Sequence, residues 1–385
     1  MFKNCPIETS LSNSDVNIDN KIRSNLFSWQ GQFSPQLIET LLINYGSINN
    51  VVFDPFLGSG TVLFESALLG LSASGCEINP AAVSFSKVYE LVNQPKVDVL
   101  KSLTLIESIL YPFLIEEQHI EELQKVLLQE VKTINKSSHI ILMALIIGLD
   151  FGEKLINAKR CAVVWETLKQ NINKLPHSGK KLRCYHSDSR KSPLLNDSVD
   201  LVITSPPYIN VFNYHQKYRK SVESTGINVL KVAKSEIGSN RKFRPNRFLT
   251  VVQYSMDMFQ VFEELTRVCK ADAKLIFIVG RESNVKKTAF KNADLISQIA
   301  NVSGFCLMGK QERVFKNKFG ELIYEEILRF TPKKEKHTNS VESAREIGRS
   351  ALKRALLYCD ESVAPELREA LEKSKEISTS PFLEA

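Results

Sequence analysis

Short apolar blocks alternate with blocks of helical periodicity over two long parts of the chain. The pattern predicts a helix over 33–46, a strand, turn and helix over 51–70, and a second such unit over 71–92. Further on it predicts strands at 182–190, 198–208 and 273–280, helices at 254–269 and 290–302, and a closing hairpin over 305–330. Strands that alternate with helices form a mostly parallel sheet covered on both faces, so the predicted fold class is α/β.

The remaining residues do not follow this alternation. Between the two parts, long helical stretches carry charged faces, and the apolar run 140–149 is typical of a buried helix. The chain therefore divides into a disordered N-terminus (1–20), an α/β domain (21–95 and 180–332), a helical insertion (96–179) and a charged helical extension (333–385).

Composition narrows the class of protein. The 385 residues are 43% hydrophobic and 24% charged, which is typical of a soluble globular protein with one large domain or two. Seven cysteines without paired spacing favour reduced thiols in a cytoplasmic protein over a zinc site or a disulfide framework. No apolar run has the length of a signal peptide core at the N-terminus or of a membrane span, so no membrane role is predicted.

Four of the predicted strands end at an acidic or hydroxyl side chain that can bind a ligand: Asp54, Glu77, Asp188 and Ser205. Parallel sheets bind ligands beyond the carboxyl ends of their strands, so we expect these residues to line one crevice. In "DPFLGSGT" (54–61) the glycines allow a ligand close to the backbone, and a plain tight turn is the alternative. The carboxylate of Glu77 is placed to accept ribose hydroxyls, and Asp188 to accept an adenine amino group, although either signal alone is weak.

The stretch "TSPPY" (204–208) freezes the backbone where a strand meets solvent. The Ser205 hydroxyl and the Pro206 carbonyl are two acceptors that can hold the hydrogens of an exocyclic base amine and aim its lone pair at an electrophile. Tyr208 offers a flat face for a base removed from its stack. An ordinary rigid loop is the alternative reading.

"DPFLGSGT" followed by "TSPPY", with "FSPQLIETLL" upstream, resembles the S-adenosylmethionine-dependent amino-methyltransferases of DNA. The resemblance covers about 22–95 and 180–332, and it implies a Rossmann-like fold with a seven-stranded sheet. It implies catalytic roles for Ser205, Pro206, Pro207 and Tyr208. It also implies a pocket for S-adenosylmethionine lined by Phe33, Ser34, Pro35, Asp54, Phe56, Gly58, Gly60, Thr61, Glu77, Asp188 and Thr204.

In this family, enzymes with serine before the two prolines mostly methylate N4 of cytosine, and those with aspartate there mostly methylate N6 of adenine. The resemblance thus implies an N4-cytosine methyltransferase of double-stranded DNA, the modification half of a restriction system with a cognate endonuclease. An N6-adenine enzyme, or a nucleic-acid-binding protein of this fold without turnover, is the alternative; RNA or protein amines are disfavoured by Ser205. The gap of 151 residues from Asp54 to Ser205 is long, and no recognition motif is identifiable.

A basic stretch follows the "TSPPY" turn. Residues 214–247 contain nine Lys or Arg and two acids, with aromatic residues interleaved. We expect phosphate contacts from Lys217, Arg219, Lys220, Arg241, Lys242 and Arg244. A solvated loop is the alternative, and His215 is a substrate contact at most. The helical insertion either reads bases or braces the sheet.

Overall fold

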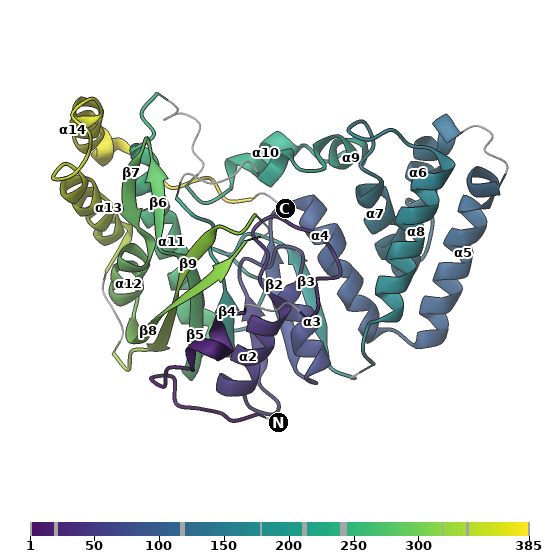
Figure 1. Cartoon of the computed structure of the whole chain (residues 1–385), viewed down its shortest axis with the longest axis horizontal. Helices are drawn as coiled ribbons and strands as arrows, with labels where there is room; N and C mark the ends of the chain where they lie inside the picture. The colour runs from purple at the N-terminus through teal and green to yellow at the C-terminus, as the bar shows by residue number, and fades with distance from the viewer. Residues whose placement is uncertain are drawn as a thin grey trace.

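The computed structural model describes residues 2–18, 22–115, 120–177, 179–209, 214–238, 245–317, 319–335 and 339–383 (Figure 1). A seven-stranded sheet has the order β3-β2-β1-β4-β5-β9-β8. Its strands are β1 (Val51–Asp54), β2 (Ser72–Glu77), β3 (Leu182–His186), β4 (Val199–Thr204), β5 (Cys269–Gly280), β8 (Phe305–Lys316) and β9 (Leu322–Pro332). Only β9 runs antiparallel to its neighbours in this sheet. The predicted α/β fold with a mostly parallel sheet is confirmed.

Helices cover both faces of the sheet because the central strands are apolar on both. Adjacent residues of β1, Val52 and Phe53, are both buried but belong to different cores, as the alternation of side chains along a strand requires. One core includes α2 (Pro35–Tyr45), α3 (Thr61–Leu68) and α4 (Pro80–Lys87). The other includes α11 (Leu249–Val268), α12 (Asn292–Val302) and α13 (Val341–Ala355).

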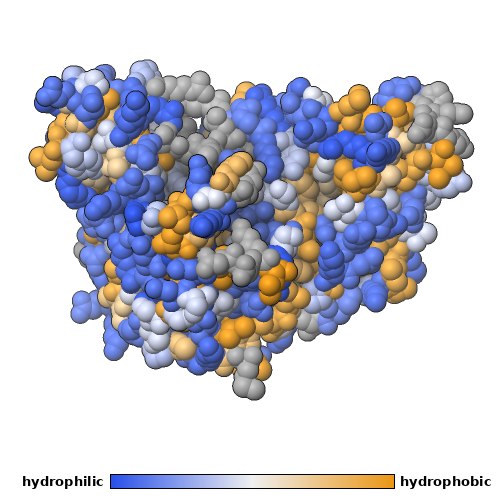
Figure 2. Space-filling view, in the orientation of Figure 1, coloured by the Kyte–Doolittle hydropathy of each residue, from blue (hydrophilic) through white to orange (hydrophobic). Residues whose placement is uncertain are grey.

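The segment between β2 and β3 is helical. After a 3-10 turn at Val88–Asn93 it forms α5 (Lys96–Ile115), α6 (Leu123–Glu130), α7 (Lys136–Leu149) and α8 (Ala158–Asn173). α7 packs against α4, α5 and α8, and most of its side chains are buried, which confirms the buried helix predicted at 140–149. Figure 2 shows apolar residues on the surface over this part of the molecule. Several of the exposed ones belong to α5: Val97, Leu100, Leu105, Tyr111 and Ile115.

The N-terminal segment differs from its prediction. Residues 2–18 include a short helix, α1 (Asn13–Val16), and bury the side chain of Val16. Arg329 of β9 is 1% exposed, and its Nη1 donates to the carbonyl of Thr9 at 2.7 Å and to the hydroxyl of Tyr45 at 2.8 Å. A buried guanidinium needs such acceptors, so the polar segment 2–18 is ordered by its contacts with the sheet.

The C-terminal residues pack on α11. A Cβ at Gly348 of α13 would lie 2.7 Å from the Cα of Val252, so glycine allows the two helices to approach closely. α14 (Ala364–Lys373) follows, and the chain then returns across α11 with Ile377 and Ser380 buried. These helices complete the second core, although their charged sequence suggests an appended extension.

Two other segments contain more structure than expected. The basic stretch, for which no helix was predicted, includes a 3-10 turn (Tyr214–Gln216), α9 (Arg219–Ser224) and α10 (Val229–Lys234). A second sheet pairs β6 (Glu282–Val285) with β7 (Thr288–Lys291), which was not predicted. Over the described residues, the helices lack the combined length and apolar content that crossing a membrane requires.

Candidate active site

The strand ends that carry the predicted chemistry lie at one edge of the sheet. β3, β2, β1 and β4 are adjacent and parallel, so their carboxyl ends point in the same direction. Asp54 ends β1, and its partner Gly75 in β2 is two residues before Glu77. β4 ends at Thr204, directly before Ser205. The strand ends thus lie at one edge of the sheet, as predicted, whereas their lining of one crevice stays a prediction.

The turn after β1 is left-handed at both glycines. The backbone angle φ is +54° at Gly58 and +91° at Gly60, values that glycine adopts without strain. A Cβ at Gly60 would also lie 2.6 Å from Cε2 of Tyr89. α3 starts directly after this turn at Thr61, so the free N–H groups of its first residues lie at the same edge of the sheet.

The loop that leads into α2 is held beside this glycine-rich turn. Asn25 bridges the two, because its Nδ2 donates to the carbonyl of Phe33 at 2.8 Å and its Oδ1 accepts from the hydroxyl of Thr61 at 2.7 Å. The amide of Gln32 also donates to the hydroxyl of Ser59. The segment predicted to close the cofactor pocket thus lies next to the turn predicted to bind the cofactor.

Asp54 is buried and connects the glycine-rich turn to the strand that leads into the "TSPPY" turn. Its Oδ1 accepts a hydrogen bond of 3.0 Å from the backbone N–H of Phe56 and one of 2.6 Å from the hydroxyl of Thr204. Burial raises the pKa of Asp54 to about 7, and these two hydrogen bonds oppose the rise. Asp54 and Thr204, both predicted to bind the cofactor, are bound to each other.

Glu77 supports the same turn from β2. Its Oε2 accepts from the backbone N–H of Gly58 at 2.8 Å, and its Oε1 accepts from that of Asn79 at 2.7 Å. Burial raises the pKa of Glu77 to about 7, although these hydrogen bonds lower it. Each oxygen keeps lone pairs beyond these two bonds, so the carboxylate can hold the turn and still accept a ribose hydroxyl.

Asp188 has a different environment from the one expected. Its Oδ1 accepts from the backbone N–H of Arg190 at 3.0 Å and from the Arg190 Nε at 2.9 Å, and its Oδ2 accepts from Nη2 at 2.6 Å. The backbone N–H of Leu383 donates to Oδ2 at 3.2 Å. A carboxylate has about four acceptor sites, so an adenine amino group would have to replace one of these donors.

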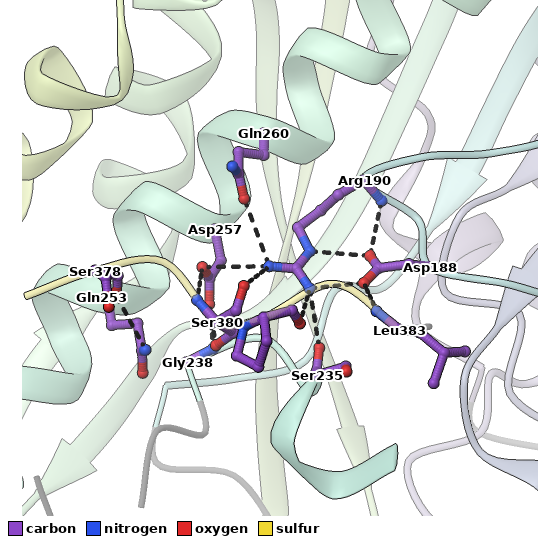
Figure 3. Close-up of polar contacts among 11 residues, drawn as sticks. Asp188, Arg190, Ser235, Gly238, Gln253, Asp257, Gln260, Ser378, Ser380 and Leu383 are labelled. Atoms are coloured by element: carbon purple, nitrogen blue, oxygen red, sulfur yellow. Dashed lines mark hydrogen bonds and ion pairs between the residues drawn. The ribbon is translucent and has the colours of Figure 1, made fainter. Parts of the chain in front are cut away.

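Figure 3 shows how the C-terminal segment passes over this pair. Arg190 Nη1 donates to the carbonyl of Ser380 at 2.7 Å, and Nη2 donates to that of Pro381 at 2.9 Å. The buried carboxylate of Asp257 in α11 accepts from both the backbone N–H and the hydroxyl of Ser380, at 2.8 and 2.7 Å. Sequence reasoning missed this contact because Arg190 and Ser380 are far apart in the chain.

The predicted catalytic turn lies at the end of β4. Ser205 and Pro207 are half-buried, whereas Pro206 is buried. The ring of Tyr208 lies against the end of β5, where a Cβ added to Gly280 would be 3.2 Å from Cζ of the tyrosine. The turn therefore presents Ser205 at the same edge of the sheet as the glycine-rich turn.

A cavity of about 50 Å³ lies between these elements. Its walls include Phe33 and Ser34 from the N-terminal loop and Ser205 from the catalytic turn. The hydroxyl of Ser34 is buried without a hydrogen-bond partner among the described residues. Arg313 and Glu325 of the β8–β9 hairpin complete the wall, and sequence reasoning missed both. Both strands carry several charged residues, so no local signal distinguished these two.

The described part of the basic stretch makes internal contacts. Lys217 Nζ lies 5.1 Å from the ring centroid of Trp29, and burial lowers its pKa. Arg219 pairs with Glu223, and Lys220 pairs with Glu153 in the insertion. His215 is buried, with Nδ1 3.3 Å from Oε1 of Glu236. Arg241, Lys242 and Arg244 lie outside the described residues, so their predicted role stays a prediction.

Comparisons with known proteins find methyltransferases. A family model described as DNA methylase matches residues 3–88, and one described as RMKL-like methyltransferase domain matches residues 47–236. The type II methyltransferase M.MjaII of Methanocaldococcus jannaschii is 33% identical over 73 residues, which cover 19% of this chain and 13% of that protein. M.BsoBI of Geobacillus stearothermophilus is 22% identical over 289 residues, covering 57% of this chain and 55% of that protein.

Solved structures of methyltransferases also match. One from Methanosarcina mazei is 10% identical and covers 75% of this chain and 95% of its own, with a TM-score of 0.35. One from Aquifex aeolicus is 13% identical and covers 77% and 99%, with a TM-score of 0.31.

The fold is that of the Rossmann-like methyltransferases. Over these matched residues the chain is similar to DNA methylases and other methyltransferases, which supports the resemblance of its motifs to the DNA amino-methyltransferases. The similarity supports S-adenosylmethionine as the cofactor.

The residues at the sheet edge fit this cofactor unevenly. Near the glycine-rich turn, the unpartnered hydroxyl of Ser34 and the carboxylate of Glu77 offer polar groups to a ligand. At the expected adenine position, the carboxylate of Asp188 is already satisfied by Arg190 and Leu383. The predicted contact between Asp188 and adenine would therefore need a rearrangement of this carboxylate or of the C-terminal segment.

Proposed function

We propose that this protein is a site-specific methyltransferase of double-stranded DNA that transfers a methyl group to the exocyclic N4 amine of cytosine. One observation carries the proposal. The Asp54–Thr204 hydrogen bond joins the glycine-rich turn to the strand that presents Ser205, and Ser205 lines one cavity with Phe33 and Ser34. That arrangement brings groups suited to a sulfonium cofactor and groups suited to a base amine together.

When bound, S-adenosylmethionine supplies an electrophilic methyl group on a positively charged sulfur. The chain has to supply orientation, because the lone pair of a base amine is delocalised into the ring. The hydroxyl of Ser205 and the carbonyl of Pro206 accept the two amine hydrogens and turn the nitrogen toward tetrahedral geometry. The two prolines hold these acceptors in place before the reaction, so little reorganisation accompanies it.

Nitrogen attack forms the N–C bond while the methyl–sulfur bond breaks, and the electron pair of that bond stays on sulfur. The nitrogen then carries the positive charge and releases one proton to water. No general base is required, and His215 is left out because it is buried beside Glu236. Tyr208 supplies a flat face for the displaced base.

A role in restriction–modification is the finer part of the proposal. Both curated relatives are named type II methyltransferases, which supports pairing with an endonuclease of the same site. DNA would approach from the basic stretch, which contains Lys217, Arg219 and Lys220 and, further along the sequence, Arg241, Lys242 and Arg244.

Base analysis of methylated DNA tests the proposal. The purified protein is incubated with host DNA and S-adenosylmethionine that carries an isotopically labelled methyl group, and digested nucleosides are separated by mass. We expect labelled N4-methylcytosine in one sequence context. Labelled N6-methyladenine would show that the target is adenine instead of cytosine. The absence of any labelled nucleoside would contradict enzymatic activity on DNA.

A further inference from the structure

A buried ion pair on the β8–β9 hairpin faces the cavity that contains Ser205. Arg313 and Glu325 lie directly opposite each other in the antiparallel ladder, and Nη1 of the arginine is 3.1 Å from Oε2 of the glutamate. Arg313 is only 3% exposed. Burying a charged pair is costly even when its members are matched, so a pair that brings little stability to the fold is a candidate for binding.

The guanidinium of Arg313 has capacity for another acceptor. Its Nε has no hydrogen-bond partner among the described residues, although it is fully buried. Nε and Nη2 lie on one edge of the planar group, and the contact with Glu325 uses Nη1. The ring of Phe315 lies 4.4 Å from the guanidinium carbon and limits its orientations. One edge of Arg313 is therefore left to donate two parallel hydrogen bonds.

The sheet places this pair close to the catalytic turn. Glu325 pairs with Gly280 of β5, which is the glycine against which the ring of Tyr208 packs. Ser205 and Arg313 line the same cavity.

We propose that Arg313, held by Glu325, binds the Watson–Crick edge of the target cytosine; this rests on the proposed function and adds the group that selects the base. Cytosine presents N3 and O2 as adjacent acceptors beside its amine, which match the Nε and Nη2 donors. Adenine presents N1 next to a C–H, so it offers one acceptor. With the amine at Ser205 and the other two groups at Arg313, all three polar positions of the edge are bound.

The charge of the pair favours a base as the ligand of this cavity over the methionine carboxylate of the cofactor. Arg313 and Glu325 together are neutral, and a second carboxylate in this cavity would lie near that of Glu325. A neutral heterocycle carries no such repulsion. The aromatic side chain of Phe315, which lines the cavity, provides apolar surface for it.

A double-mutant cycle that combines protein variants with a base analogue tests this inference. Wild type, Arg313→Lys and Arg313→Gln are assayed on a duplex with the mapped target cytosine and on one with 3-deazacytosine, which keeps the amine but lacks the N3 acceptor. Two variants are used so that the cycle survives a failure of one to fold. Arg281→Lys is the matched control, because Arg281 makes an exposed pair with Glu312 on the same sheet.

We expect each Arg313 variant to lose about 10- to 100-fold in kcat/KM on cytosine and much less on 3-deazacytosine, since the contact is already absent there. Comparing variants on each substrate cancels the different reactivity of the analogue. Affinity for S-adenosylhomocysteine, measured by calorimetry, should be unchanged. Arg281→Lys should resemble wild type on both substrates.

Three results would overturn the inference. Equal losses of kcat/KM on both bases would show that Arg313 does not contact N3. Weaker binding of S-adenosylhomocysteine by the Arg313 variants would show that Arg313 binds the cofactor. N6-methyladenine as the wild-type product would contradict cytosine recognition while leaving DNA methylation intact. A protein without any methylated product would instead contradict the proposed function.

Discussion

The hydroxyl of Thr204 donates a hydrogen bond of 2.6 Å to the buried carboxylate of Asp54. These residues end adjacent parallel strands, and each is followed directly by one of the two turns that carry the chemistry. The contact therefore sets the glycine-rich turn relative to Ser205. Because both groups are buried, the hydrogen bond cannot be replaced by water without a change in the structure.

Replacement of Thr204 by valine should disturb both turns. Valine has nearly the same shape but removes the shorter of the two hydrogen bonds of Asp54, and loss of a donor to a buried acceptor costs about 1–3 kcal/mol. We expect a lower free energy of unfolding in urea and weaker binding of S-adenosylhomocysteine. Thr204→Ser keeps the hydroxyl and serves as the control. Wild-type cofactor affinity in Thr204→Val would show that the two turns are set independently.

Stability without cofactor should depend on pH through Asp54 and Glu77. Burial raises the pKa of each carboxyl to about 7, above its value in the unfolded chain. The folded state thus binds more protons between about pH 4 and 7, so these groups stabilise the fold most at low pH and that contribution is lost as pH rises through 7.

Urea unfolding at several pH values checks this direction. The free energy of unfolding of Asp54→Asn, which cannot lose a proton, should fall less between pH 5 and 8 than that of wild type. The comparison with wild type separates Asp54 from the other titrating groups. Parallel pH curves for the two proteins would mean that Asp54 does not titrate in this range.

The C-terminal segment should compete with the nucleoside end of the cofactor. Leu383→Pro removes the N–H that donates to Asp188, and Leu383→Ala retains it. If adenine takes that acceptor, the proline variant should bind S-adenosylhomocysteine up to about tenfold more tightly, whereas the alanine variant should match wild type. Weaker binding by the proline variant would instead make the segment a wall of the pocket.

The part of the site that follows chain order was predictable from sequence. A strand with an acidic end and a glycine turn after it has few possible geometries, so Asp54, Gly58 and Glu77 could be assigned to one edge. Arg313 and Glu325 could not, because the register of a hairpin decides which of its charges face inward. The contact of Asp188 with Leu383 joins residues 195 positions apart and has no local signal at all.

The central claim is that the Ser205 turn activates a base amine delivered beside the cofactor. The most direct test is single-turnover methyl transfer to cytosine by wild type and Ser205→Ala, with S-adenosylhomocysteine affinity measured alongside. Loss of the acceptor should slow transfer by about 100-fold or more and leave that affinity within about twofold. Transfer at the wild-type rate by Ser205→Ala would contradict the account.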